Sequence, residues 1–289
     1  MSEKITRVEF TNLDKILYPE AKITKAKIIE YYIRVAPRML GFLSDRPLSL
    51  TRFPDGVDKQ GFYEKDTPRG TPKWVSTFRR YSESAKRHLD YILCNDLDTL
   101  IWLANLAALE IHVTLSRADS FESPDLALFD IDPEPPATFD DAVDVALTVE
   151  DRLDHLGLKS YIKTSGKKGL HLVVPIRAGY TFEQTREFVH GIGKSLASGS
   201  EIIVSELSDS KKSGTVFIDY LQNSHGRTMA CPYSLRATPY ATVSTPLDWS
   251  DLKKGIKPEE FNILTVIKNS KSPWQDLMKN KQSLRREYG

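Results

Sequence analysis

The segment Leu126-Ala127-Leu128-Phe129-Asp130-Ile131-Asp132-Pro133 is apolar except for two aspartates near its end. Its apolar, β-prone side chains and the closing proline predict a buried β-strand. Residues two apart on a strand project from the same face, so we expect Asp130 and Asp132 to lie side by side. Two carboxylates this close repel each other unless one is protonated or a cation lies between them. Their oxygens suit Mg²⁺ or Mn²⁺, and the alternative is a pair of solvated acids at a strand end.

A second segment, residues 161–175, is expected to form a strand, a basic turn and another strand. The turn Ser165-Gly166-Lys167-Lys168-Gly169 offers backbone N–H groups, a hydroxyl and two ammonium groups, which are donors suited to an anion. It lacks the residue order of a Walker phosphate loop, and the alternative is a solvated hairpin. We expect His171 to face out of the following strand. A third apolar strand, residues 216–220, carries one acid, Asp219, and the three acids with the turn indicate metal-assisted phosphoryl or nucleotidyl transfer.

The composition is that of a globular protein, with 289 residues, 40% apolar and 27% charged. Proteins that coat long stretches of nucleic acid are expected to be strongly basic, and the net charge of +1 argues against that class. Contacts with nucleic acid are therefore expected to be local. Apolar runs fall short of the about 20 residues that span a bilayer, and the start lacks a signal-peptide stretch. The two cysteines, Cys94 and Cys231, are far apart in sequence, which indicates a reducing compartment and a cytoplasmic location.

Strands and helices are expected to alternate along the chain, which predicts an α/β or α+β fold. Thr24 and Thr181 have the chemistry of helix N-caps. The expected helices cover residues 25–39, 96–109, 140–155 and 182–197. The expected strands, besides those above, cover residues 46–53 and 158–163, and a polar hairpin tip is expected at 208–214.

Several motifs, taken in order, resemble the polymerase domain of the bacterial and archaeal non-homologous end-joining DNA repair ligases (ligase D type). That family is a branch of the archaeo-eukaryotic primase superfamily. The resemblance covers nearly the whole chain, and its motifs are specific together rather than singly. They are Leu13-Asp14-Lys15-Ile16-Leu17-Tyr18-Pro19, Arg52-Phe53-Pro54-Asp55-Gly56-Val57, Trp102-Leu103-Ala104-Asn105-Leu106, Glu110-Ile111-His112, Asp130-Ile131-Asp132-Pro133, Ser165-Gly166-Lys167-Lys168-Gly169-Leu170-His171, Asp219-Tyr220-Leu221-Gln222-Asn223, Pro232-Tyr233-Ser234-Leu235-Arg236 and Thr245-Pro246-Leu247-Asp248-Trp249.

The resemblance implies an α+β fold of α/β-sandwich type, forming one primase-polymerase catalytic domain over residues 1–289. Its core would have two sheets, one of them RNA-recognition-motif-like, with flanking helices. The implied activity is template-dependent nucleotide addition by a two-metal mechanism, with gap filling and end extension in double-strand break repair and a preference for ribonucleotides. The implied partners are NTP or dNTP, DNA with gaps, overhangs or broken ends and a 5′-phosphate, a DNA ligase and Ku, with no membrane. During repair the protein would be nucleoid-associated.

Two alternatives to this function remain. A de novo primase shares the three acids, but it would usually carry a zinc-binding element or a helical initiation domain, and the sequence has no Cys/His cluster. A non-catalytic DNA-end binding module would not need all three acids. A ligase is disfavoured because the Lys-x-Asp-Gly adenylation motif is absent from the sequence.

The resemblance also assigns roles to individual residues. Asp130, Asp132 and Asp219 would be catalytic and would hold two divalent cations, Mn²⁺ or Mg²⁺. Nucleotide-binding roles fall on His112, Ser165, Lys168, His171, Gln222 and Arg236. DNA-binding roles fall on Lys15 and Lys25 for a recessed 5′-phosphate, Phe62 and Tyr63 for the template, and Lys212 beside the active site. Tyr63 and Lys212 depart from the family pattern, where Phe and Arg are common, and lysine lacks the bidentate fork of arginine.

Overall fold

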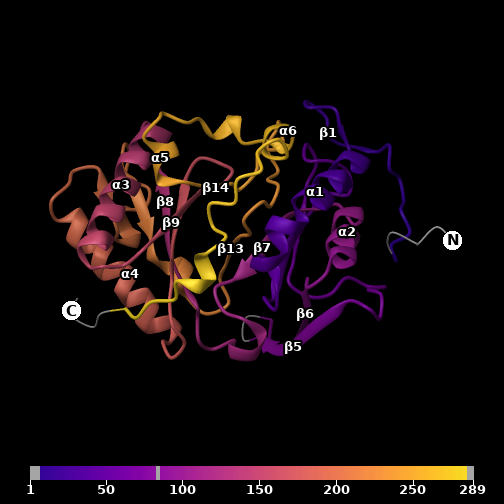
Figure 1. Ribbon diagram of the computed structural model, residues 1–289, viewed down its shortest axis with the longest axis horizontal. Coiled ribbons are helices and arrows are strands. Elements are labelled where there is room, and N and C mark those ends of the chain that lie inside the picture. The colour runs from indigo at the N-terminus through magenta and orange to yellow at the C-terminus, as the bar shows by residue number, and fades with distance from the viewer. Residues whose placement is uncertain (1–6, 83–84, 285–289) are drawn as a thin grey trace. The chain divides into compact units, whose positions relative to one another are not determined.

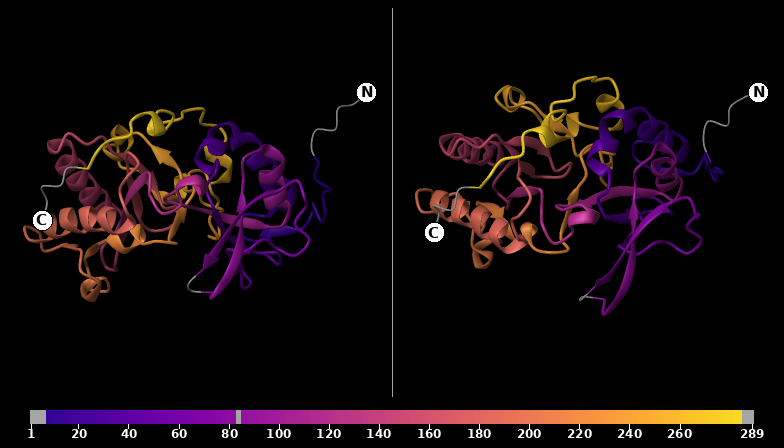
Figure 2. Two further views of the ribbon diagram at one scale, coloured as in Figure 1. Left: turned by 90° about the horizontal axis from the view of Figure 1, so that it is seen from below. Right: turned by 60° about the horizontal axis from the view of Figure 1, so that its bottom comes forward.

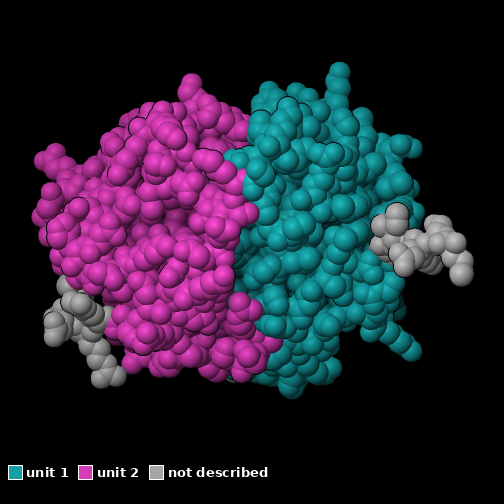
Figure 3. All heavy atoms as spheres, viewed as in Figure 1, with its two compact units in different colours: residues 1–114, 230–243, 262–270 teal, residues 115–229, 244–261, 271–289 magenta. Residues whose placement is uncertain are grey.

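The computed structural model describes residues 7–82 and 85–284 of the chain. They divide into two compact units, coloured separately in Figure 3. Unit 1 comprises residues 1–114, 230–243 and 262–270, and unit 2 comprises residues 115–229, 244–261 and 271–289. Each unit has its own principal sheet and its own buried side chains, which confirms the mixed α+β class. The expectation of a single catalytic domain over residues 1–289 stays a prediction.

Unit 2 is built on a six-stranded sheet in the order β11-β12-β8-β10-β9-β14. The strands are β8 (Leu126–Pro133), β9 (Tyr161–Thr164), β10 (Leu170–Pro175), β11 (Ile203–Val204), β12 (Val216–Asp219) and β14 (Pro246–Leu247). The central pairs β12–β8, β8–β10 and β10–β9 are all antiparallel, whereas β11 and β12 are parallel. The strand expected at the two aspartates is therefore central to the sheet, with Asp130 buried and Asp132, near the end of the strand, partly exposed.

Helices cover one face of this sheet. They are α3 (Phe139–His155), α4 (Phe182–Ala197) and the short α5 (Trp249–Leu252), and α3 and α4 are labelled in Figure 1. Thr138 and Thr181 cap α3 and α4, each within a capping box that satisfies backbone donors at the helix start. The apolar stripes of both helices pack against Phe129 and Ile131 of β8 and their neighbours. Short 3-10 helices complete the unit: η1 (Ala118–Ser120), η2 (Leu207–Asp209), η3 (Tyr220–Asn223), η4 (Pro258–Glu260) and η5 (Leu277–Lys279).

Unit 1 contains a four-stranded sheet in the order β13-β7-β3-β4 and two small two-stranded sheets, β1-β2 and β5-β6. The strands are β1 (Ile16–Tyr18), β2 (Ile23–Thr24), β3 (Leu48–Arg52), β4 (Phe62–Glu64), β5 (Ser76–Ser82), β6 (Arg87–Leu93), β7 (Ala108–Thr114) and β13 (Thr228–Ala230), the last of which ends in unit 1. The β5–β6 ribbon extends away from the rest of unit 1 in Figure 2. Two principal sheets are thus confirmed, and the RNA-recognition-motif-like character of one stays a prediction.

The helices of unit 1 are α1 (Lys25–Leu43), α2 (Leu97–Asn105) and the short α6 (Ile263–Val266). Thr24 caps α1 by accepting from the Lys27 N–H, as expected, and the helix continues past Pro37 to Leu43. Tyr31 and Tyr32 of α1 are buried, and their hydroxyls donate to the carbonyls of Tyr233 and Leu109. These bonds supply the partners that buried phenol groups require, and they tie α1 to the segment that carries Arg236.

Two local expectations are wrong. The expected helix over residues 96–109 ends at Asn105, and Ala107, with φ of 56°, turns the chain into strand β7. Residues 208–214 are not a hairpin tip, because the strands on either side, β11 and β12, run parallel. In the part of the chain that the structure describes, no helix has the length and apolar character required to cross a membrane.

Candidate active site

A row of polar side chains crosses the central strands of unit 2. Asp219 of β12 lies opposite Asp130 of β8, Asp130 opposite His171 of β10, and His171 opposite Lys163 of β9. Directly opposed residues in antiparallel strands project from the same face of a sheet. The alternating residues of β8, including Phe129 and Ile131, fill the core on the helix-covered face. The row therefore lies on the opposite face, and the expected alternation is confirmed.

Three carboxylates lie at this end of the sheet, Asp130, which is buried, and Asp132 and Asp219, which are partly buried, and they are close enough to perturb one another. Burial, followed by repulsion from Asp130, raises the pKa of Asp132 to about 6, although His171 and Lys168 favour its charged form. Burial, followed by repulsion from Asp130, also raises the pKa of Asp219. Such shifts mean that negative charge is costly here until a cation or a proton balances it. The electrostatics therefore favour a site that binds cations.

The donor set fits a hard divalent cation. Carboxylate oxygens are the ligands that Mg²⁺ and Mn²⁺ accept in proteins. Within residues 7–82 and 85–284, however, no three His, Cys, Asp or Glu side chains converge into a ready-made metal cage. Mg²⁺ sites in nucleotide enzymes commonly use one or two carboxylates and complete their shell with water and substrate phosphates. The geometry of unit 2 is compatible with such an open site, with Asp130, Asp132 and Asp219 as the ligands available.

The predicted basic turn joins β9 to β10 beside the acids. Ser165 Oγ accepts from the backbone N–H groups of Lys167 and Gly169, at 3.2 and 3.1 Å. Gly169 packs so tightly that a Cβ there would lie 2.3 Å from the Ile131 carbonyl and 2.7 Å from Asp132 Oδ1. Lys168 Nζ donates to the Pro133 carbonyl at 3.0 Å. These contacts fix the turn against the end of β8. They also bring the ammonium group of Lys168 close to the acids.

His171 and Gln222 contact the acids directly. His171 Nε2 lies 3.2 Å from Asp130 Oδ1, and Gln222 Nε2 donates to Asp219 Oδ2 at 3.2 Å. On the other side of the ring, Lys163 Nζ lies 2.8 Å from His171 Nδ1. Sequence reasoning had given Lys163 no role. Its signal was a lone charged residue in an apolar strand, but only the strand register shows that it faces His171.

The predicted nucleotide contacts His112 and Arg236 lie in unit 1, where one carboxylate links them. Glu110 Oε1 accepts from Arg236 Nε at 3.2 Å and from the Ala237 N–H at 3.0 Å. The other oxygen, Glu110 Oε2, lies 3.5 Å from His112 Nε2. Glu110 and Arg236 are both buried. Sequence reasoning placed Glu110 in a motif with His112 but gave it no role. The two-residue spacing puts both residues on one face of β7, but only the fold brings Glu110 to Arg236, which is 126 residues away in the chain.

The aromatic pair Phe62 and Tyr63 is at the surface of unit 1. Their exposed fractions are 41% and 54%, which excludes a role in the core. The Arg52 guanidinium lies over the Phe62 ring at 5.0 Å, and Lys65 Nζ lies 5.9 Å from the Tyr63 ring centroid. Exposed aromatic rings beside cations are suited to stacking on bases next to phosphates.

Lys15 and Lys25 are close together in unit 1. The Lys25 N–H donates to the Lys15 carbonyl at 2.9 Å, and Lys25 is the first residue of α1. Burial, followed by repulsion from Lys15, lowers the pKa of Lys25. Lys15 Nζ forms an ion pair with Asp55 at 2.7 Å. The pairing of two ammonium groups at a helix start is favourable for an anion, whose charge would relieve their repulsion.

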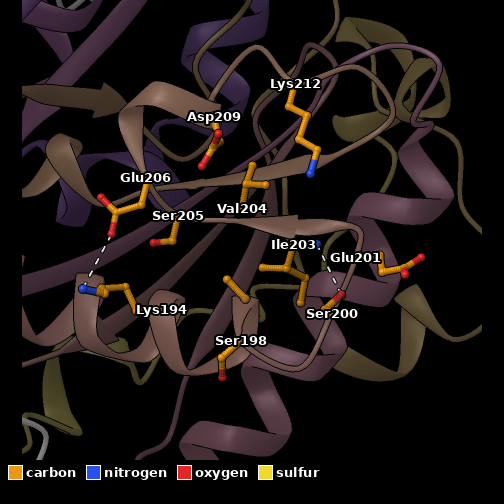
Figure 4. A pocket seen from close by; sticks show the side chains of 11 residues that line it. Lys194, Ser198, Ser200, Glu201, Ile203, Val204, Ser205, Glu206, Asp209 and Lys212 are labelled. Carbon is orange, nitrogen blue, oxygen red and sulfur yellow. Dashed lines mark hydrogen bonds and ion pairs between the residues drawn. The ribbon is translucent and has the colours of Figure 1, made fainter.

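Lys212 lines a pocket of unit 2 formed by the end of α4, β11 and η2 (Figure 4). Figure 4 shows its side chain extending toward the pocket, which it shares with the acids Glu206 and Asp209. Asp130, Asp132 and Asp219 do not line this pocket. Its role beside the active site stays a prediction.

Comparison with known proteins identifies the family. The family described as LigD, primase-polymerase domain, matches residues 24–278 of the chain. The chain belongs to this family. It is therefore a primase-polymerase type nucleotidyltransferase domain, and membership implies dependence on a divalent metal in general.

Named relatives and a solved structure agree with this assignment. The chain is 34% identical, over 96% of its length, to the bifunctional non-homologous end joining protein LigD of Bacillus subtilis. It is 35% identical, over 85% of its length, to the multifunctional non-homologous end joining DNA repair protein LigD of Mycobacterium tuberculosis H37Rv. It spans 45% and 33% of those two proteins. The polymerase domain of M. tuberculosis ligase D in complex with DNA matches 96% of this chain and 100% of its own, with TM-score 0.87 and 31% identity.

Proposed function

We propose that this domain adds nucleotides to the 3′ end of a primer on a DNA template, filling gaps and extending broken ends during non-homologous end joining. The observation that carries the proposal is the arrangement of polar residues in unit 2. Asp130 and Asp219 project from the same face of the sheet, and the basic turn at Ser165 packs against the end of the strand that carries Asp130. Its relatives are named as end-joining proteins, and the matched domain is in complex with DNA. We infer that a ligase and Ku are partners in that process, as the family resemblance implies.

The residues of unit 2 would divide the chemistry as follows. Asp130, Asp132 and Asp219 would hold two divalent ions, and such ions lower the pKa of a 3′-hydroxyl and neutralise a triphosphate. Ser165 and Lys168 would hold phosphate oxygens, which fixes the α-phosphate in line with the attacking oxygen. Half of the Lys168 side chain is exposed, so its ammonium group can reorient toward a bound anion. We assign His112 and Arg236 of unit 1 to further phosphate contacts on the resemblance alone.

The choice of sugar is part of the proposal. The family resemblance favours ribonucleotides, and a 2′-hydroxyl can both donate and accept a hydrogen bond. Gln222 offers an amide beside Asp219, within the same site. Its amide oxygen or nitrogen is a group that could bind the 2′-hydroxyl.

The test is primer extension on a gapped template with a downstream 5′-phosphate, comparing NTPs with dNTPs in Mn²⁺ and in Mg²⁺. We expect templated addition that requires a divalent ion, with NTPs used at least as well as dNTPs. Asp219→Asn should abolish addition, whereas Asp144→Asn, an exposed residue of α3, should leave it unchanged. Synthesis from an unprimed template would favour the primase alternative, and DNA binding without addition in any metal would favour the non-catalytic module.

A further inference from the structure

Lys163 is a lysine with no exposed surface, on β9, the second strand from one edge of the sheet of unit 2. Its ammonium group lies 2.8 Å from His171 Nδ1 and 2.5 Å from Ser244 Oγ. Burying an ammonium group is unfavourable unless hydrogen bonds replace the water that it loses. The contacts of the ammonium group with His171 and Ser244 supply these hydrogen bonds.

The directions of the hydrogen bonds follow from the groups involved. Ser244 Oγ donates its proton to the Thr164 carbonyl at 2.9 Å, so it accepts from Lys163. An ammonium group has donors and no acceptor, so His171 Nδ1 also accepts from Lys163. A neutral imidazole carries one N–H, which must then be on Nε2. That nitrogen is 3.2 Å from Asp130 Oδ1, the distance of a hydrogen bond to a carboxylate.

We propose that Lys163 is a positioning residue that fixes His171 as the Nε2–H tautomer and, through it, orients the carboxylate of Asp130. This proposal rests on the proposed function, since it gives Asp130 its place in the catalytic site. Lys163 of β9 is two strands away from Asp130 of β8, and His171 of β10 lies between them. It acts through the ring of His171, which connects β9 to β8 across β10.

The alternative tautomer shows why the ammonium matters. With the proton on Nδ1, the lone pair of Nε2 would face the Asp130 carboxylate at 3.2 Å, which is a repulsive contact. Asp130 would then rotate or the ring would turn, and the orientation of the carboxylate would be lost. Groups that orient ligating side chains in this way affect metal affinity or activity by about 10–100-fold when replaced.

A direct test reads the tautomer in the wild-type protein. The full chain, labelled with ¹⁵N-histidine and kept free of metal, is studied by long-range ¹H–¹⁵N NMR, and His171→Gln identifies the His171 signals. We expect the neutral Nε2–H form. A neutral Nδ1–H ring or a doubly protonated ring would overturn the proposal. This measurement needs neither DNA nor nucleotide, so its failure is distinct from a failure of the proposed polymerase activity.

A second test replaces the ammonium with a thioether of similar length. Lys163→Met should reduce Mn²⁺ affinity, measured by electron paramagnetic resonance of free Mn²⁺, and kcat for nucleotide addition by about 10–100-fold each. The KM for primer–template should stay within about twofold, because Lys163 is buried away from solvent. The matched control is Lys159→Met, which removes an exposed lysine paired with Asp276 and should leave these quantities unchanged.

The outcomes separate positioning from space filling. Wild-type Mn²⁺ affinity and an unchanged His171 tautomer in Lys163→Met would show that Lys163 only fills the sheet, and the proposal would fail. If this variant does not fold, the tautomer of His171 in the wild-type protein decides the question alone. Loss of Mn²⁺ binding with the predicted tautomer would support the proposal even for a chain that adds no nucleotides.

Discussion

The burial of Asp132 beside Asp130 predicts that the charged form of this side chain destabilises the metal-free protein. Its pKa is raised from the usual 3.8 to about 6, chiefly by burial and then by Asp130. The folded state therefore binds this proton more tightly than the unfolded chain does. As the pH rises from 3.8 to about 6, Asp132 loses its proton and the free energy of unfolding falls. Above about pH 6 the folded protein bears the full cost of holding a charged Asp132.

The size of the penalty follows from the shift. A tenfold change in an equilibrium constant is about 1.4 kcal/mol, so raising the pKa from 3.8 to about 6 costs about 3 kcal/mol at pH 8. Asp132→Asn keeps the shape of the side chain and removes its charge. We expect the variant to be more stable than the wild type by about 1–3 kcal/mol at pH 8, and by about half as much at pH 5. The same variant should be inactive in nucleotide addition.

The assay is denaturant unfolding in EDTA at pH 5 and pH 8, with hydrogen exchange of the β8 amides reporting on unit 2. Asp144→Asn, on the exposed side of α3, is the matched control and should change stability by less than about 0.5 kcal/mol. Added Mn²⁺ should stabilise the wild type more than Asp132→Asn, since only a site with its charge intact binds the ion tightly. The reasoning is refuted if Asp132→Asn destabilises the metal-free protein at pH 8, or stabilises it equally at both pH values.

Three further predictions address the remaining parts of the site. The double variant Lys15→Ala/Lys25→Ala should lose the wild-type preference for gapped DNA with a downstream 5′-phosphate, measured by binding at fixed salt, and should keep its activity on a simple primer–template; an unchanged preference would place the phosphate pocket elsewhere. Glu110→Gln should raise the KM for the nucleotide about 10-fold with a smaller change in kcat, because Arg236 loses its charged partner. An unaltered KM in steady-state kinetics would contradict this prediction. Gly169→Ala should reduce nucleotide addition at least about 10-fold, since its Cβ would meet the Ile131 carbonyl at 2.3 Å; wild-type kinetics in that variant would show that the turn relaxes without consequence.

Features that depend on neighbouring residues were predictable from the sequence. Asp130 and Asp132 share a face because side chains alternate on any strand. Thr24 and Thr181 start helices because a side-chain oxygen there reaches an N–H within the same turn. The turn at Ser165 follows from its glycines, and the family was evident from motifs in the correct order. The assignment of roles to single residues, beyond these positions, stays a prediction.

Features that depend on pairing between distant segments were decided only by the tertiary structure. The helix expected over 96–109 stops because Ala107 adopts a positive φ, which strand β7 stabilises by pairing with β3. The register of four strands puts Lys163, His171, Asp130 and Asp219 in one row, and a shift of one residue would turn each to the other face. The sequence by itself determined which chemical groups and which local elements this protein has. Only the fold decided which groups touch, because strand register is set by contacts among segments far apart in the chain.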